Sequence, residues 1–326
     1  MCIKLRILPV LNILIVFTLS GCAQSRYQYG VRGQTSYERP DQPQPTNPVA
    51  IGGHHPRIDR LETAVHAPGR FIKSHLPWKK DESDDRSPEQ LRAEAIELAQ
   101  AYLTDNNLHD VHIDVRRYEP GEQWARLLAN NRISPFWKYT GGSLSVVVYS
   151  LFPARAFHSD SYNPYTNTLS LNSAKPIEAL YEAGHAKEYH KHELLGTYSM
   201  SQKLPVLPLA HNWRVTSDVI TYAQVSDREE VKNELYPSAY GNFSGSVVSE
   251  ALYFFPIGKG ATQIFASFAV KALGGGVGKL AGHAAARDLE DQPDRAEQPD
   301  SAEQTDSTEQ PDRAEQPDQE QLSASE

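Results

Sequence analysis

The stretch "TLSLNSAKPIEALYEAGHA", residues 168–186, joins a predicted strand to a predicted helix and decides the fold. Residues 168–171 have the composition of a strand, and Pro176 favours a helix that begins there, because proline suits the first helical position. That helix places Glu182 and His185 about one turn apart. The candidate functional residues therefore lie on the first helix after the strand.

Local signals predict a second helix and a second strand before this point. Ser87 is a predicted N-cap, Pro88 takes the first helical position, and Gln90 completes a capping box for a helix within residues 87–107. In residues 111–115, apolar side chains alternate with polar ones, the pattern of a strand with one buried face. The chain between residues 57 and 250 therefore suits one globular domain.

Two further segments are expected to contribute to the core. Residues 121–131 predict a short helix, with Trp124, Leu127 and Leu128 on its core side. Residues 143–153, "SLSVVVYSLFP", are the most apolar part of the body. Because eleven residues cannot cross a hydrocarbon layer of about 30 Å, we expect a buried strand or a short core helix.

The N-terminus has the pattern of an export signal. A basic start precedes an apolar run that ends in Leu-Ser-Gly-Cys, so residues 1–21 predict a signal peptide. The ending resembles the lipobox of bacterial lipoproteins, which implies cleavage before Cys22 and lipidation of that residue. An ordinary signal peptide or an uncleaved anchor are the alternatives. Each places the body outside the cytoplasm, in the cell envelope, and Ala23 favours the outer membrane if one exists.

The two ends of the chain have compositions unlike the body. Residues 288–326 repeat "EQPDRA" and carry 14 acidic residues and 2 Arg, a net charge of −12, whereas the whole chain carries −9. This tail cannot bury enough apolar surface to fold, and disorder is expected. Residues 22–56 are rich in proline near "ERPDQPQPTNP" and predict an extended tether that holds the body away from the lipid surface.

The helix that carries Glu182 resembles the active-site helix of zincin metallopeptidases, whose signature is His-Glu-x-x-His. Residues 181–185 read Tyr-Glu-Ala-Gly-His, and the small residues around Gly184 match the "HEAGHA" version of that helix. The resemblance implies that Glu182 is the general base and His185 the second zinc ligand. Tyr181 stands at the first ligand position, where a phenol of pKa near 10 is a poor ligand.

A second ligand position is also altered. Gluzincin-like families take their third ligand from a Glu-x-x-Ala-Asp pattern, and the nearest match is "RVTSD", residues 214–218. Arg214 stands where the ligand should be, and a guanidinium cannot bind a cation. Either His211 and Asp218 join His185 around an atypical zinc ion, or His185 is an ordinary hydrogen-bonded, half-buried histidine.

A third hypothesis explains both substitutions together. Loss of zinc leaves Glu182 as an unpaired carboxylate in a partly buried cleft, which is costly. We therefore expect Arg214 to pair with Glu182 or with Asp218, and Tyr181 to fill the volume of the missing imidazole.

The segment over residues 251–287 mixes aromatic and small residues, with Gly274, Gly278 and Gly282 spaced four apart as in closely packed helices. Three lysines interrupt any 20-residue span, so a helix docked on the body, on a membrane surface or on a partner is expected in place of a transmembrane helix. The sequence does not choose among these three.

The expected fold class is α+β and helix-rich, with a zincin-like helix pair and a small sheet between a disordered N-terminal tether and a disordered C-terminal tail. The expected function is that of a lipid-anchored protein whose metallopeptidase-like domain binds a partner or is purely structural, with no cofactor. The alternatives are an active zinc peptidase and a membrane-interacting assembly protein that acts through residues 251–287. No phosphate-binding loop or basic stripe suggests nucleic acid, and the sequence identifies no protein partner.

Overall fold

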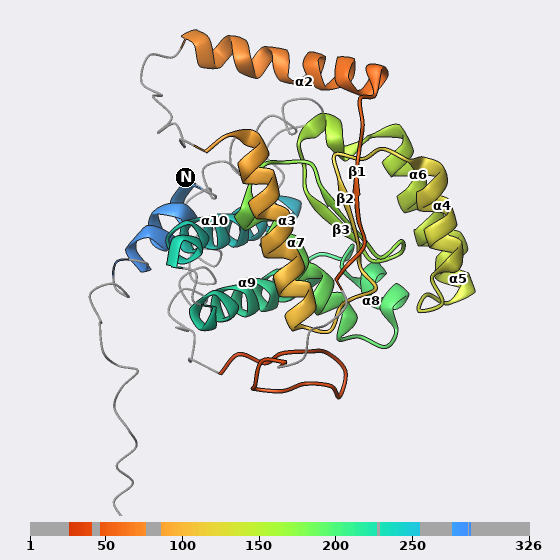
Figure 1. Cartoon of the computed structure of the whole chain (residues 1–326), viewed down its shortest axis with the longest axis vertical. Helices are drawn as coiled ribbons and strands as arrows, with labels where there is room; N and C mark the ends of the chain where they lie inside the picture. The colour runs from red at the N-terminus through yellow and green to blue at the C-terminus, as the bar shows by residue number, and fades with distance from the viewer. Residues whose placement is uncertain are drawn as a thin grey trace, which may run out of the picture.

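The computed structural model describes residues 26–40, 46–75, 86–226, 229–254, 276–285 and 287. It confirms a helix-rich α+β protein in which one small sheet lies between helical layers (Figure 1). The strands are β1 (Val49–Ile51), β2 (His112–Val115), β3 (Ser161–Asn163) and β4 (Thr168–Leu171). The helices are α2 (Pro56–His75), α3 (Pro88–Asp105), α4 (Pro120–Ala129), α5 (Pro135–Trp137), α6 (Ser143–Leu151), α7 (Pro176–His190), α8 (Leu195–Ser201), α9 (Leu207–Val225) and α10 (Glu229–Phe254), with a π-helical turn η1 (Lys138–Gly142) and a 3₁₀ turn η2 (Ala154–Phe157).

The sheet has the strand order β1-β2-β4-β3. The pairs β1–β2 and β2–β4 are parallel, whereas β3 runs antiparallel to β4 at the edge. Helices α3, α7 and α9 cover one face, and α4, α5 and α6 lie on the other side (Figure 1). The strand over residues 168–171 and the helix that begins at Pro176 are both confirmed as β4 and α7.

The cap of α3 forms as predicted, whereas β2 is buried on both faces. Gln90 N–H donates to the Ser87 hydroxyl at 3.2 Å, and the Gln90 side chain accepts from Ser87 N–H at 2.7 Å. The expected polar face of β2 includes Asp114, which is only 2% exposed. Helix α4 covers it, and Arg126 donates to both Asp114 oxygens at 2.8 and 3.1 Å, so an ion pair satisfies the buried carboxylate.

The prediction of an extended tether is wrong for residues 26–40. Tyr27, Tyr29 and Val31 are buried in the main core, at 3%, 8% and 8% exposure. Arg39 Nε bonds Asp105 at the end of α3 at 3.0 Å. The segment therefore belongs to the globular domain, and the sequence suggested otherwise because its apolar residues are few and widely spaced.

The prediction that residues 143–153 are buried is also wrong. The segment is helical from 143 to 151, but Val146 is the only buried residue of that helix, whereas Leu144 and Leu151 are 64% and 66% exposed. In α4, Leu127 is buried as expected, but Leu128 is 52% exposed. The outer layer of helices therefore turns apolar side chains away from the sheet.

Residues 276–285 form a helix that packs against α10 (Figure 1, blue). A Cβ added at Gly278 would lie 2.3 Å from the Tyr240 carbonyl oxygen, and one at Gly282 would lie 2.4 Å from the Tyr236 carbonyl oxygen. The predicted close packing at these two glycines is thus confirmed, and this part of the segment is docked on the body. Gly274 lies outside the described residues.

We expect Gly282→Ala to loosen this helix from α10, because the new Cβ meets backbone atoms that cannot rotate away. The cost should be about 1–3 kcal/mol in the free energy of unfolding, with faster hydrogen exchange across residues 276–285. Gly276→Ala is the matched control, since nothing lies within 4 Å of its Cβ and the gain in helix propensity is the same. Equal exchange rates in both variants would contradict the packing argument.

The predicted signal peptide, Cys22, the greater part of the Gly-rich segment and the acidic tail lie outside the described residues. Within the described ranges, every helix is too short or too polar to cross a membrane.

Candidate functional site

Helix α7, which carries Tyr181, Glu182 and His185, lies between α3 and α9 (Figure 1). Gly184 allows α9 to come close, because a Cβ at this position would lie 2.6 Å from Val219 Cγ2 and 3.1 Å from Val215 Cγ1. The small residue before His185 therefore has a packing reason: it brings α9, which carries His211, Arg214 and Asp218, against α7.

Tyr181, Glu182 and His185 line one cavity of about 690 Å³. Further wall residues come from the segment before β3, from α9 and α10, and from the helix over residues 276–285, which contributes Lys279. Asp160, Glu178 and Glu182 add carboxyl groups to the wall, and Lys175 adds an amine. The cavity is therefore polar and of a size that holds a small ligand.

Glu182 is held against the edge strand. The Tyr162 backbone N–H donates to Glu182 Oε2 at 2.9 Å. Burial, with smaller contributions from the nearby Asp160 and Glu178 carboxyl groups, raises the pKa of Glu182 to about 8, although the hydrogen bond from Tyr162 opposes the shift. At neutral pH this carboxyl group therefore carries a proton, as a hydrogen-bond donor or a general acid would.

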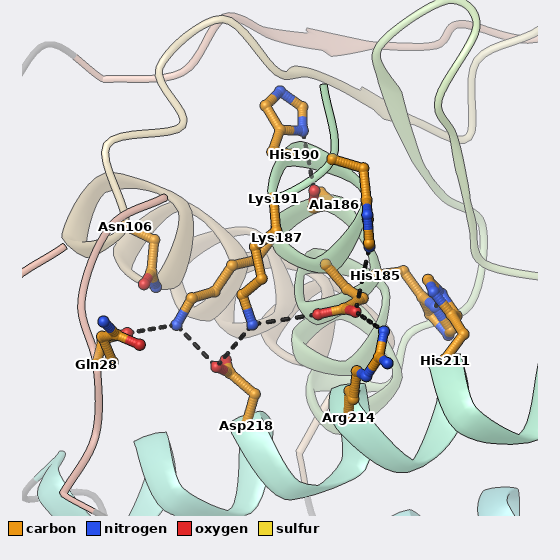
Figure 2. Close-up of polar contacts among 12 residues, drawn as sticks. Gln28, Asn106, His185, Ala186, Lys187, His190, Lys191, His211, Arg214 and Asp218 are labelled. Carbon is orange, nitrogen blue, oxygen red and sulfur yellow. Dashed lines mark hydrogen bonds and ion pairs between the residues drawn. The ribbon is translucent and has the colours of Figure 1, made fainter. Parts of the chain in front are cut away.

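His185 and His211 bond directly to each other. His185 Nδ1 lies 2.7 Å from His211 Nε2, with the rings stacked at 4.9 Å between centroids (Figure 2). The Tyr198 hydroxyl lies 2.9 Å from His211 Nδ1. Burial lowers the pKa of both histidines to about 3, so both rings are neutral at physiological pH. His185 is thus the hydrogen-bonded, half-buried histidine of the second hypothesis.

Tyr181 packs its ring edge-on against His185, with 5.0 Å between centroids. Its hydroxyl lies 3.2 Å from the Thr216 hydroxyl on α9. Burial raises the pKa of Tyr181, which keeps the phenol neutral. The side chain therefore acts as a packing group between α7 and α9.

Asp218 does not join the two histidines. It accepts a hydrogen bond from Lys187 Nζ at 2.8 Å (Figure 2) and another from the Tyr102 hydroxyl. Lys187 is 1% exposed, and its Nζ also donates to the Tyr27 hydroxyl at 2.9 Å and to the Gln28 carbonyl at 2.6 Å. Burial lowers the pKa of Lys187 to about 8 despite the pull of Asp218 in the other direction. We call this group the Lys187 cluster.

Arg214 does not pair with Glu182 or with Asp218, so that hypothesis is wrong. Its Nη1 lies 3.2 Å from Glu188 Oε1, with 54% of the arginine side chain exposed and 3% of the glutamate (Figure 2). The hydrogen bond to Glu188 raises the pKa of Arg214. Glu188 follows Glu182 by six residues on α7, so the arginine pairs with a carboxylate near the C-terminal end of that helix. Glu182 therefore has no ion pair with Arg214.

The zinc set His185, His211 and Asp218 does not fit a metal ion. Both nitrogens of His211 have partners, and Asp218 is paired with Lys187. Of the four ring nitrogens of His185 and His211, this leaves Nε2 of His185 for a ligand, and within the described ranges no group of three His, Cys, Asp or Glu side chains could hold an ion. The residues that match the zincin pattern therefore lie on the cavity wall. They offer one available ligand, whereas a structural or catalytic zinc ion needs at least three.

Sequence reasoning missed Lys187 and Tyr27. The signal for Lys187 is its spacing, since it follows the buried Ala183 by four residues on α7 and therefore lies on the core face. Tyr27 had no comparable signal, because its partners are 79 to 191 positions away in the chain. No family model, curated protein or solved structure matches this chain.

Proposed function

We propose that the chain is a lipid-anchored envelope protein whose metallopeptidase-like domain binds a ligand in the Glu182 cavity and does not hydrolyse peptides. One observation carries the proposal: His211 uses both ring nitrogens within the protein, so the histidine pair stabilises the α7–α9 contact and offers no second ligand to a metal. The protonated Glu182 further supports it, because a general base must be ionised to take a proton from water.

The cavity itself favours binding. Tyr181, Glu182 and His185 lie at its wall, to which Asn212 and Asn242 add amide groups. A cavity of about 690 Å³ with amide, carboxyl and imidazole groups suits a small polar ligand or part of a peptide. The anchor predicted at Cys22 would keep this cavity at a membrane surface.

Metal content and hydrolysis together test the proposal. We expect the purified chain, dialysed against micromolar zinc, to hold far less than one zinc ion per molecule, and its hydrolysis of a fluorogenic peptide library to equal that of Glu182→Gln. Stoichiometric zinc that is lost in His185→Ala, together with hydrolysis that is lost in Glu182→Gln, would instead establish the zinc peptidase. His192→Ala is the control, because this half-exposed histidine lies outside the cavity wall.

A further inference from the structure

The outer helical layer presents a continuous apolar stripe. Residues 135–151 run as α5, η1 and α6 without a break. On α6, Leu144, Val147, Val148 and Leu151 follow the i, i+3, i+4, i+7 spacing of one helix face. They are 64%, 41%, 48% and 66% exposed. Preceding turns add two aromatic side chains, so the α6 stripe consists of Phe136, Tyr139, Leu144, Val147, Val148 and Leu151.

The fold does not need this stripe. The opposite face of α6 contributes Val146, which is fully buried in a small core with Leu127, Tyr165 and Leu195. Scattered exposed apolar residues are common, but four large ones on one helix face, with two exposed aromatic residues on the turns before it, are not. Such patches are typical of surfaces that contact a partner or a membrane. Phe152, 63% exposed, extends the patch beyond the end of α6.

The polar groups along the stripe are already bonded inside the helix. Thr140 Oγ1 donates to the Phe136 carbonyl at 2.7 Å, and Ser150 Oγ donates to the Val146 carbonyl at 2.7 Å. Ser145 Oγ donates to the Gly142 carbonyl at 2.8 Å. No charged residue occurs between Tyr139 and Pro153. These three hydroxyl groups can therefore leave water without becoming unsatisfied donors in an apolar medium.

Helix α8 and the turn before it link the N-terminal segment to Trp137, which lies between the two aromatic residues of the stripe. Trp137 Nε1 donates to Thr197 Oγ1 of α8 at 2.9 Å. On the other side, Tyr198 stacks on His192, whose carbonyl accepts a hydrogen bond from Arg32 of the N-terminal segment. In Figure 1 the N-terminal segment and α8 lie at the lower end of the molecule, with α5 close to α8.

The predicted anchor makes a bilayer the surface that this stripe meets. Only four residues separate Cys22 from Tyr27, and four to five extended residues span at most about 18 Å. Because Tyr27 is buried in the Lys187 cluster, the domain is held at that distance from the lipid. This step rests on the lipidation in the proposed function.

We propose that the α6 stripe lies on the lipid surface, in the interface of the bilayer, and orients the domain on its membrane. The contact is with the acyl-glycerol boundary of the lipids, since the stripe is apolar with aromatic residues at one end and carries no charge for headgroups. Anionic lipid is therefore not required.

Vesicle flotation tests this with a chain that begins at residue 23, which lacks the lipid but keeps every described residue. Phosphatidylcholine vesicles should carry this chain, and Leu144→Glu/Leu151→Glu should lower the partition coefficient about tenfold or more. Leu61→Glu/Val225→Glu is the matched control, because it adds the same charge at exposed apolar residues elsewhere and should change partitioning less than about twofold. Unchanged circular dichroism and melting temperature verify the folding of both variants.

Three outcomes overturn the proposal. The parent chain fails to float, the stripe and control variants float alike, or the parent forms dimers that the stripe variant disrupts without any vesicle binding, in which case the stripe is a protein interface. The mass of the mature protein reports lipidation of Cys22 separately. If Cys22 is unlipidated but the chain still binds vesicles, the predicted lipid anchor is wrong and the membrane contact of the α6 stripe is supported.

Discussion

Lys187→Met is expected to lower the free energy of unfolding by about 3–5 kcal/mol, the largest effect of any single change considered for this protein. Lys187 is 1% exposed, and its charge is matched by Asp218 at 2.8 Å. Methionine fills a similar volume but leaves Asp218 as a partly buried carboxylate without its main cation, and the Gln28 carbonyl without its donor. Chemical denaturation at pH 7 measures the loss.

Two further variants make the Lys187 prediction specific. Lys191→Met removes a lysine that is 37% exposed and lies 3.7 Å from the same carboxylate, so it should cost less than about 1 kcal/mol. Lys187→Met/Asp218→Asn removes both charges while the amide oxygen can still accept from the Tyr102 hydroxyl, and it should recover much of the stability. Similar losses for Lys187→Met and Lys191→Met would show that the buried ion pair is not what stabilises this region.

Glu182 should contribute a fall of about 2 kcal/mol in the free energy of unfolding between pH 6.5 and pH 8, and Glu182→Gln should remove this contribution. The pKa of Glu182 is about 8 in the folded protein and 4.5 ordinarily, so the folded chain keeps a proton that the unfolded chain releases. Stability from a raised carboxyl pKa is complete below 4.5 and is lost as the pH rises through 8. Each pH unit in this window costs about 1.4 kcal/mol.

The histidine pair gives the opposite slope on the acid side. The pKa of His185 and of His211 is about 3 when folded and 6.5 ordinarily, so below pH 6.5 the unfolded chain binds two protons that the folded chain does not. In the parent protein, the proton that only the folded chain keeps on Glu182 cancels one of these two protons. Glu182→Gln should therefore double the acid-side slope, from about 1.4 to about 2.8 kcal/mol per pH unit. Denaturation midpoints of the two proteins between pH 4.5 and 8 measure both effects, and parallel curves would contradict the raised pKa.

Elements set by neighbouring residues were predictable from the sequence, and contacts between distant residues were not. The cap at Ser87, the strand at 168–171 and the helix from Pro176 depend on residues a few positions apart. The site was predicted in part: Glu182 and His185 do share a cavity, and His211 does approach His185.

The errors have physical reasons. Arg214 pairs with Glu188 and not with Glu182. The zincin pattern gives the spacing of residues along α9, but it does not give the turn of α7 that Arg214 faces. The apolar run at 143–153 was expected in the core because hydropathy does not distinguish a buried face from one that turns outward. Asp114 was expected at the surface because β2 shows alternation, which cannot reveal that α4 supplies an arginine above it.

The position of Tyr27 in the Lys187 cluster also bears on the order in which the protein matures. Its hydroxyl bonds Asn106, Lys187 and Asp218, which follow it by 79, 160 and 191 residues. During synthesis from the N-terminus, the residues next to the predicted export signal have no place to dock until α9 has been made. A cleavage site at the predicted signal would therefore stay free of the folded domain during export, and the completed fold would then enclose Tyr27.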